Sequence, residues 1–218
     1  MKRAMKNLSL VLASLFLLSL LVNPALAGVK FGVKGGITLA NIKSVPDTFE
    51  GYSWETKMGL AGGISMEIGL PGPFSIQPEV LYVQKGAKIT FTEGDITGTF
   101  KANIDYIEIP VLLKYNLVSG GLTIPSVYAG PYFGFNSSAK FVLSAPGYPD
   151  QTEDIKDDIK DTEFGAVVGV GLTQKLGLFR VTLDARYDLG LSNIVEVTEG
   201  GPESIKTRTW LFMVGLSF

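Results

Sequence analysis

The residues that could do chemistry in this sequence are charged side chains at alternate positions of apolar segments. Ionised Lys, Arg, Asp and Glu can bind ions, line a solute path or pair with one another. The set comprises seven cations and seven anions: Lys30, Lys34, Lys57, Lys85, Lys114, Arg180, Arg186, Glu55, Glu67, Glu79, Glu108, Glu163, Asp184 and Asp188. Because an unpaired buried charge costs several kcal/mol, we interpret the set as a structural network of paired charges. An ion or solute path is the alternative.

The composition excludes most familiar catalytic machinery. The chain has no Cys, so thiolate nucleophiles, disulfides and Cys-based metal sites are excluded. It has no His, the commonest general base and metal ligand. We therefore expect no catalytic residue, no cofactor and no metal. A hydrolase built on two carboxylates alone is the remaining enzymatic alternative, but no pair of carboxylates stands out.

The most polar segment, residues 143–161, could bind a divalent cation. Its charged residues are Asp150, Glu153, Asp154, Lys156, Asp157, Asp158, Lys160 and Asp161. Carboxylates bind Ca²⁺ and Mg²⁺, and at a cell surface such an ion would bridge lipopolysaccharide phosphates. The spacing does not follow the EF-hand pattern, so a solvated loop is the favoured interpretation.

The charged positions lie in segments where apolar and polar residues alternate with the period of a β-strand. The alternation is clear in residues 29–39, 54–68, 179–189 and 209–218, and less strict in 74–90, 102–117, 126–142 and 162–175. These eight predicted strands are longer than the roughly five to six residues usual in soluble proteins. They match the roughly 9–11 residues of a tilted transmembrane strand.

The connections alternate between short and long, as in outer-membrane barrels. Residues 70–73, 118–123 and 175–177 are short turns, whereas residues 41–53, 91–101, 143–161 and 192–206 are long and polar. We predict an all-β, eight-stranded antiparallel up-and-down transmembrane barrel with a polar, charge-paired interior. The alternative is a soluble sandwich or a lipocalin-like barrel, which would turn the apolar stripes inward.

The first 27 residues have the pattern of a secretory signal peptide. Lys2, Arg3 and Lys6 precede an apolar run from Leu8 to Val22, and residues 25–27 form an A-x-A cleavage site. The run is shorter than the roughly 20 residues of a membrane-spanning helix, which disfavours an uncleaved anchor. We predict cleavage after Ala27, a barrel domain over residues 28–218 and a location in the outer membrane.

The chain end and the aromatic residues suggest how the barrel meets the membrane. A terminal strand that ends in Phe218 is similar to the insertion signal of bacterial outer-membrane proteins, so the barrel-assembly machinery is an expected partner. Aromatics near the strand ends are expected to form interfacial girdles: Phe31, Trp54, Tyr82, Tyr115, Tyr187, Trp210 and Phe218. Outer-membrane lipid and lipopolysaccharide are the other expected partners. The acidic balance of the chain gives no footprint for nucleic acid.

Several strings resemble the PorT-like outer-membrane β-barrel family, which is widespread in Bacteroidota and their relatives. They are FGVKGGITLANI at 31–42, PEVLYVQKGAKI at 78–89, YIEIPVLLKYNL at 106–117, AGPYFGF at 129–135, DARYDLGLSNI at 184–194 and WLFMVGLSF at 210–218. The resemblance implies an eight-stranded outer-membrane barrel and brings no catalytic or ligand residues. The function we expect is non-enzymatic, either structural in the envelope or an interaction with a surface or envelope protein. A small passive channel is the alternative, and a periplasmic ligand-binding barrel or a lipid-modifying enzyme is less favoured.

Overall fold

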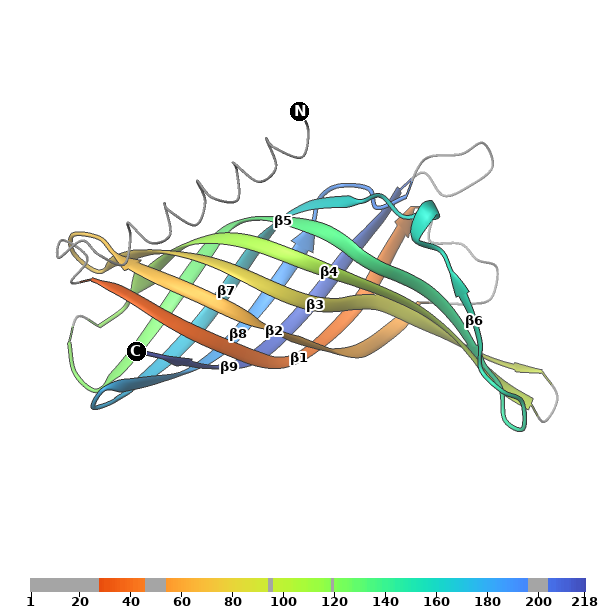
Figure 1. The fold of residues 1–218 in the computed structure, drawn as a ribbon, viewed down its shortest axis with the longest axis horizontal. Helices are drawn as coiled ribbons and strands as arrows, with labels where there is room; N and C mark the ends of the chain where they lie inside the picture. The colour runs from red at the N-terminus through yellow and green to blue at the C-terminus, as the bar shows by residue number, and fades with distance from the viewer. Residues whose placement is uncertain (1–27, 46–53, 94–95, 119, 196–203) are drawn as a thin grey trace, which may run out of the picture.

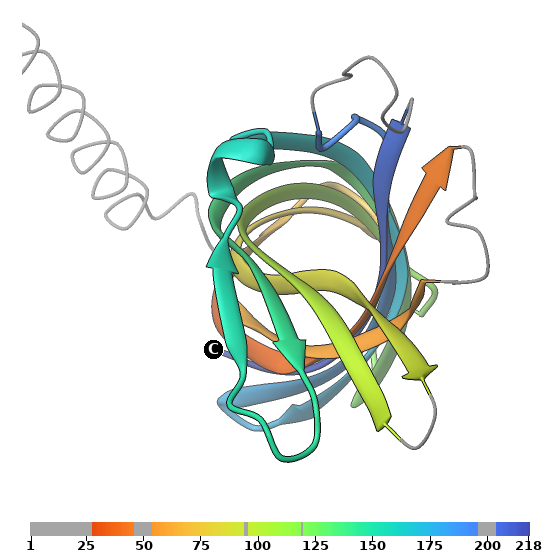
Figure 2. The same cartoon turned by 90° about the vertical axis from the view of Figure 1, so that its right-hand side faces the viewer.

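Eight long antiparallel strands close into a ring in the computed structural model (Figures 1 and 2). The structure describes residues 28–45, 54–93, 96–118, 120–195 and 204–218. The ring strands are β1 (Val29–Val45), β2 (Glu55–Gly69), β3 (Phe74–Glu93), β4 (Ile96–Asn116), β5 (Thr123–Ser144), β7 (Thr162–Leu176), β8 (Phe179–Gly190) and β9 (Ser204–Ser217). The ring closes because β1, the first strand, pairs with β9, the last strand, as well as with β2. Neither β1 nor β9 is therefore left with a free edge. The eight-stranded all-β barrel expected from the alternation is thus confirmed.

The short turns gather at one end of the barrel and the long connections at the other. We call these the short-turn end, where Phe218 lies, and the long-loop end. The turn between β7 and β8 is two residues long, and Gly177 there adopts a φ of 68°, which a side chain would disfavour. The predicted signal peptide, the residues 46–53 and most of the 192–206 connection lie outside the described residues.

One segment predicted to be a long loop, residues 91–101, is largely strand, and that part of the prediction is wrong, whereas the long connection at 143–161 contains only a short strand. Strand β3 continues to Glu93 and β4 begins at Ile96, so the described residues of 91–101 are paired strand instead of loop. Strand β6 (Gln151–Asp154) pairs with β5 outside the ring, and a short 3₁₀ helix, η2 (Lys156–Asp158), follows it. Cross-strand aromatic contacts stabilise this extension: the ring of Phe100 lies 4.8 Å from Phe91 and 5.5 Å from Phe141. Figure 1 shows it projecting beyond the rest of the long-loop end.

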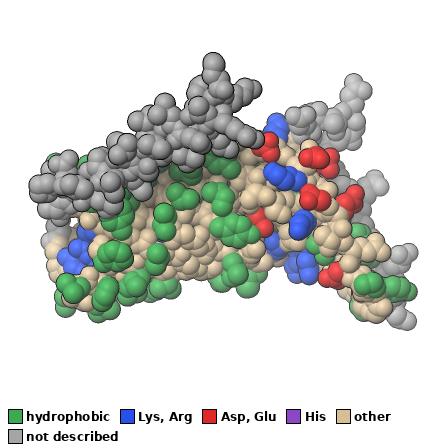
Figure 3. Space-filling view, in the orientation of Figure 1, with side chains coloured by type: hydrophobic (Ala, Val, Ile, Leu, Met, Phe, Trp, Pro, Cys, Tyr) green, Lys and Arg blue, Asp and Glu red, His purple; other side chains and the backbone are tan. Residues whose placement is uncertain are grey.

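The outer wall of the barrel is apolar, as a lipid-facing surface requires. Leu60, Leu183 and Val214 are more than half exposed, whereas their chain neighbours Asp184 and Met213 are buried. Figure 3 shows hydrophobic side chains along the barrel wall and charged side chains concentrated at the long-loop end. Within the described ranges, no helix has the length and hydropathy needed to cross a membrane.

Aromatic side chains meet in pairs toward both ends of this wall. Tyr115 packs against Phe74 at 5.2 Å on the short-turn side, and Tyr187 packs against Trp210 at 4.8 Å toward the other end. Their partial exposure fits side chains that lie in the interface between lipid and water.

The interior is not uniformly polar, which corrects the sequence-based expectation. Inward positions of β2, β3 and β9 carry an apolar cluster of Ala61, Leu81, Val83, Leu211 and Met213. A second cluster joins Leu112, Tyr128, Tyr132 and Val167. An eight-stranded barrel is narrow enough for side chains to fill it, and apolar groups fill the space between charges without requiring partners of their own.

Candidate functional site: the charge network in the lumen

The buried charges form two connected groups, and the first is centred on Lys85. Its Nζ lies 2.6 Å from Oε1 of Glu108 and 3.0 Å from Oε2 of Glu163, and it donates a hydrogen bond of 3.1 Å to the Tyr132 hydroxyl. The hydroxyl groups of Tyr132 and Thr207 both donate to Glu163. The ammonium also lies over the ring of Tyr132, 4.6 Å from its centroid. Lys85 is fully buried, so it depends on these partners in place of water.

The second group is centred on Glu79. One of its oxygens accepts a 2.7 Å hydrogen bond from Nη1 of Arg186, and the other accepts one of 2.6 Å from Nζ of Lys34. Lys34 also contacts Asp184 at 3.3 Å, and Asp184 accepts a 2.8 Å hydrogen bond from the Tyr128 hydroxyl. Asp188 is also part of this group, 3.8 Å from Nε of Arg186.

The pairs span the lumen. Lys85 on β3 meets Glu163 on β7, and two ring strands, β4 and β5, separate them. Arg186 on β8 meets Glu79 on β3, with β9, β1 and β2 between their strands. Ion pairs between such strands are possible only if the side chains reach across the interior. The centre of the barrel is therefore crossed by buried charged side chains.

The charges do not balance at each level of the lumen. In the two buried groups, five carboxylates (Glu79, Glu108, Glu163, Asp184 and Asp188) share three cations (Lys34, Lys85 and Arg186). The hydroxyl groups of Tyr128, Tyr132 and Thr207 and the amide of Gln77 donate further hydrogen bonds to Asp184, Glu163 and Glu79. The predicted set of fourteen has equal numbers of cations and anions, but the structure places an excess of carboxylate at the centre.

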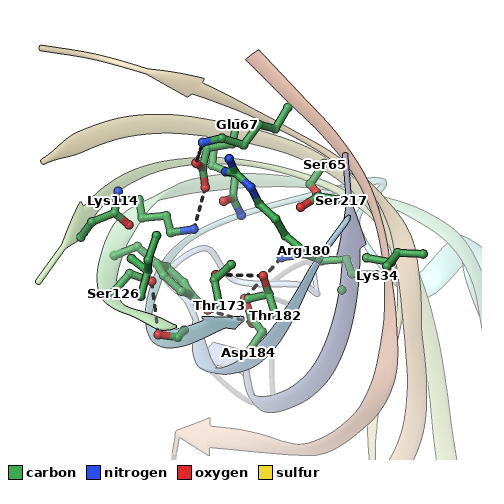
Figure 4. Close-up of a pocket in the computed structure, with 18 of the residues that line it drawn as sticks. Lys34, Ser65, Glu67, Lys114, Ser126, Thr173, Arg180, Thr182, Asp184 and Ser217 are labelled. Carbon is green, nitrogen blue, oxygen red and sulfur yellow. Dashed lines mark hydrogen bonds and ion pairs between the residues drawn. The ribbon is translucent and has the colours of Figure 1, made fainter. Parts of the chain in front are cut away.

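At the short-turn end the imbalance is reversed. Here Glu67 is the acceptor for two lysines, with Nζ of Lys30 at 2.5 Å from one oxygen and Nζ of Lys114 at 2.6 Å from the other. Arg180 lines the same space (Figure 4). The cavity they surround has a volume of about 70 Å³ and also borders Lys34 and Asp184.

Two glycines hold the tyrosines of the network in place, a feature that the sequence analysis did not recognise. In the pairing of β5 with β7, Tyr128 faces Gly169 and Tyr132 faces Gly165. A Cβ at Gly169 would lie 2.5 Å from the Tyr128 ring, and one at Gly165 would lie 2.3 Å from the Tyr132 ring. Each ring therefore lies over a glycine backbone. The sequence pattern that could have indicated this packing is a pair of tyrosines four residues apart on one strand and a pair of glycines four residues apart on the next ring strand.

An apolar layer closes the long-loop end above the network. Ile159 and Ile194, from the connections after η2 and after β8, are buried against Ile104, Tyr106 and Ala139. The two connections are joined where the amide of Lys160 donates a 2.7 Å hydrogen bond to the carbonyl of Ile194. Nζ of Lys156, in η2, donates a 3.0 Å hydrogen bond to the backbone carbonyl of Asn136 in β5. We call the described parts of these connections, residues 155–161 and 191–195, the lid.

Eight of the fourteen predicted residues belong to the two buried groups and four to the short-turn end, and the other two, Glu55 and Lys57, lie apart from both. Glu55 pairs with Lys88 at 3.0 Å near the long-loop end, where their side chains are 43% and 37% exposed. Its position at the first residue of β2 puts it beyond the closed part of the lumen. Lys57 is half-buried and donates to the backbone carbonyl of Lys85 instead of a carboxylate.

The acidic segment and the chain end also have defined places. Of the acidic residues in 143–161, Asp161 contacts Lys156 at 3.4 Å, and the described part of the chain contains no cluster of three or more carboxylates suited to a metal ion. Phe218 exchanges backbone hydrogen bonds with Phe31, so the chain end is part of the closing seam of the ring.

Comparison with known proteins bears on this geometry. A search of curated proteins gives no match. Among solved structures, the chain is similar to Ail, the attachment invasion locus protein of Yersinia pestis (14% identity, 87% of this chain and 99% of that chain, TM-score 0.42). It is also similar to Neisserial surface protein A (15%, 86% and 95%, 0.42) and to OprG from Pseudomonas aeruginosa (12%, 86% and 94%, 0.46).

The family model described as the outer membrane protein beta-barrel domain matches residues 23–196, which is most of the chain. The matched range covers the lumen network except for its partners on β9. The chain therefore belongs to the outer membrane protein beta-barrel domain family and is an integral outer-membrane protein.

Proposed function

We propose that the protein is a non-enzymatic barrel with a closed lumen, which stabilises the envelope or presents its long-loop end to a partner. The observation that carries the proposal is the set of buried ion pairs that cross the interior, above all Arg186 with Glu79 and Lys85 with Glu163. A conducting pore would need water along this path, but these four side chains are 0–2% exposed.

The absence of enzymatic activity is supported by the chemistry of the available groups. No His or Cys exists in the chain to act as base or nucleophile. Three of the buried carboxylates, Glu79, Glu163 and Asp184, each contact a cation and accept a further hydrogen bond from a neutral donor, which stabilises their ionised form. Such carboxylates have a structural role, and the lid lies between them and the solvent at the long-loop end.

Electrical recording on the refolded protein in a planar bilayer tests the closed lumen. We expect no steady single-channel conductance from the parent protein. The double variant Glu79→Ala/Arg186→Ala removes a pair that crosses the lumen and is expected to conduct. The control, Glu55→Ala/Lys88→Ala, removes an ion pair near the long-loop end and is expected to stay silent. Steady conductance of the parent protein would contradict the proposal and favour the passive channel.

The long-loop end is the proposed surface for interaction. The β3–β6 extension projects from it (Figure 1) and carries the exposed Tyr148, at 70% exposure. In outer-membrane barrels the longer loops face outward from the cell, which would place this extension among lipopolysaccharide and surface proteins. Cross-linking on intact cells from a residue of β6 is expected to capture such a partner. The same cross-linker placed next to Gly177 should not capture it.

We also propose which branch of the family the chain belongs to and where its signal peptide is cleaved. The strings YIEIPVLLKY and PEVLYVQKG support membership of the PorT-like branch, and the A-x-A motif supports cleavage after Ala27. Insertion through the barrel-assembly machinery is supported by the terminal Phe218. Amino-terminal sequencing of the protein from outer membranes should begin at Gly28, and a chain that begins at Met1 would contradict the cleavage.

A further inference from the structure

Cationic side chains outnumber carboxylates around the cavity at the short-turn end. Lys30, Lys34, Lys114 and Arg180 border it, against the carboxylates Glu67 and Asp184. Both oxygens of Glu67 are taken by Lys30 and Lys114, and Asp184 is taken by Lys34 and Tyr128. We propose that this cavity is a binding site for one small oxyanion of the phosphate class.

Arg180, which is partly exposed, gives the cavity a surplus cation. In the described part of the chain it has no carboxylate within ion-pair distance and no side-chain hydrogen bond, although it lines the cavity. Figure 4 shows its side chain extending into the space between Glu67 and Thr182 instead of toward the outside of the barrel. A guanidinium presents a fork of donors that matches two oxygens of a phosphate.

The neutral groups around the cavity suit an oxyanion as well. Ser65, Thr182 and Ser217 contribute hydroxyl groups, and Ser65 and Ser217 lie close together in Figure 4. A hydroxyl group donates readily to a phosphate oxygen. The volume of about 70 Å³ exceeds the roughly 10–15 Å³ that one water needs. It suits a single small anionic group.

The position of the cavity selects an anion over a cation. A cation would meet four ammonium or guanidinium groups, whereas an anion would offset their excess over the two carboxylates at the cavity. The site lies at the short-turn end, opposite the lid. The excess of carboxylates at the centre of the lumen would repel an anion, so it would stay at the short-turn end. The same phosphate chemistry could come from a free ion or from the headgroup of a phospholipid.

Calorimetric titration of the refolded protein, in a detergent without phosphate and at high chloride, tests the proposal. Inorganic phosphate is expected to bind the parent protein saturably at one site per chain. Arg180→Gln should weaken binding at least tenfold, and Lys160→Gln, which removes an exposed cation at the lid, should leave it unchanged. The heat-modifiable band of each variant verifies folding.

A second titration with sn-glycerol 3-phosphate separates the two sources of phosphate. Binding of both compounds supports a site that a lipid headgroup can also enter, and binding of inorganic phosphate alone supports a site for the free ion. The proposal is overturned if neither compound binds the folded parent protein, or if folded Arg180→Gln binds phosphate as tightly as the parent. Neither result bears on the closed lumen, which the conductance measurement tests separately.

Discussion

The charged side chains at the two ends of the lumen are stabilised in different ways, by protein partners at one end and partly by water at the other. Toward the long-loop end, Lys85 is fully buried among Glu108, Glu163 and two tyrosines, beneath a lid of apolar side chains. At the short-turn end, Lys30 and Glu67 keep 25% and 16% of their side chains exposed, and the cations outnumber the carboxylate they share. Where water is excluded, each charge needs partners from the protein. Where water enters, an excess of one sign is tolerated, and such an excess can attract a ligand.

The largest effect is expected from removal of the cation at the closed end. Lys85→Met keeps the length of the side chain but leaves Glu108 and Glu163 buried without a counter-charge, at a cost of about 3–5 kcal/mol in the free energy of unfolding. Urea-induced unfolding in lipid vesicles measures it. The matched variant Lys30→Met, at the partly exposed end, should cost at most about 1 kcal/mol. Equal losses for the two variants would contradict the contrast between the ends.

The next effect compares the two sides of the wall in one strand. Leu183 is 55% exposed toward lipid and Asp184 is buried in the lumen. We expect Leu183→Arg to cost about 2–4 kcal/mol if it lies near the bilayer midplane, and to impair insertion into vesicles as followed by the heat-modifiable gel shift. Asp184→Asn should still insert, with lower stability because Lys34 loses a counter-charge. Normal insertion of Leu183→Arg would show that the inside–outside assignment of β8 is wrong.

A smaller effect is expected at the glycine beneath Tyr128. Gly169→Ala would place a Cβ 2.5 Å from that ring and displace the hydroxyl from Asp184, at a cost of about 1–3 kcal/mol. The matched control is Gly215→Ala, whose Cβ would meet its nearest atom at 3.6 Å and should be tolerated. Unfolding in urea distinguishes them, and a Gly169→Ala protein as stable as the parent would show that the ring does not need this space.

The smallest effect concerns the lid. Lys156→Ala removes the hydrogen bond to the Asn136 carbonyl and the contact with Asp161. Because these groups are partly exposed, the global stability should fall by no more than about 1 kcal/mol. Hydrogen exchange of the Lys160 amide, which bonds to Ile194, should become faster while exchange in the ring strands is unchanged. Unaltered exchange at Lys160 would mean that the lid is held by its apolar contacts alone.

Much of the architecture was predictable because a strand has a period of two. Alternation assigns each side chain to lipid or lumen without knowledge of its partners, so Leu183 and Asp184 could be placed on opposite faces from the sequence. The length of the strands and the alternation of short and long connections then indicated a closed membrane barrel. The extension of β3 and β4 was missed because the polar composition of residues 91–101 resembles a loop, although Phe91 and Phe100 pair across the strands.

The sequence by itself therefore determined the strands, the face of the charges within them apart from Glu55, and the absence of His and Cys chemistry, since all three are local properties of the chain. Only the tertiary structure decided which charges meet. Lys34 pairs with Asp184 from 150 residues away, and Lys85 pairs with Glu163 from 78. Such pairings depend on the stagger with which the ring closes, and that stagger is set by all eight strands together. The apolar lid and the cationic mouth have the same origin, because each is assembled from segments that only the closed barrel brings together.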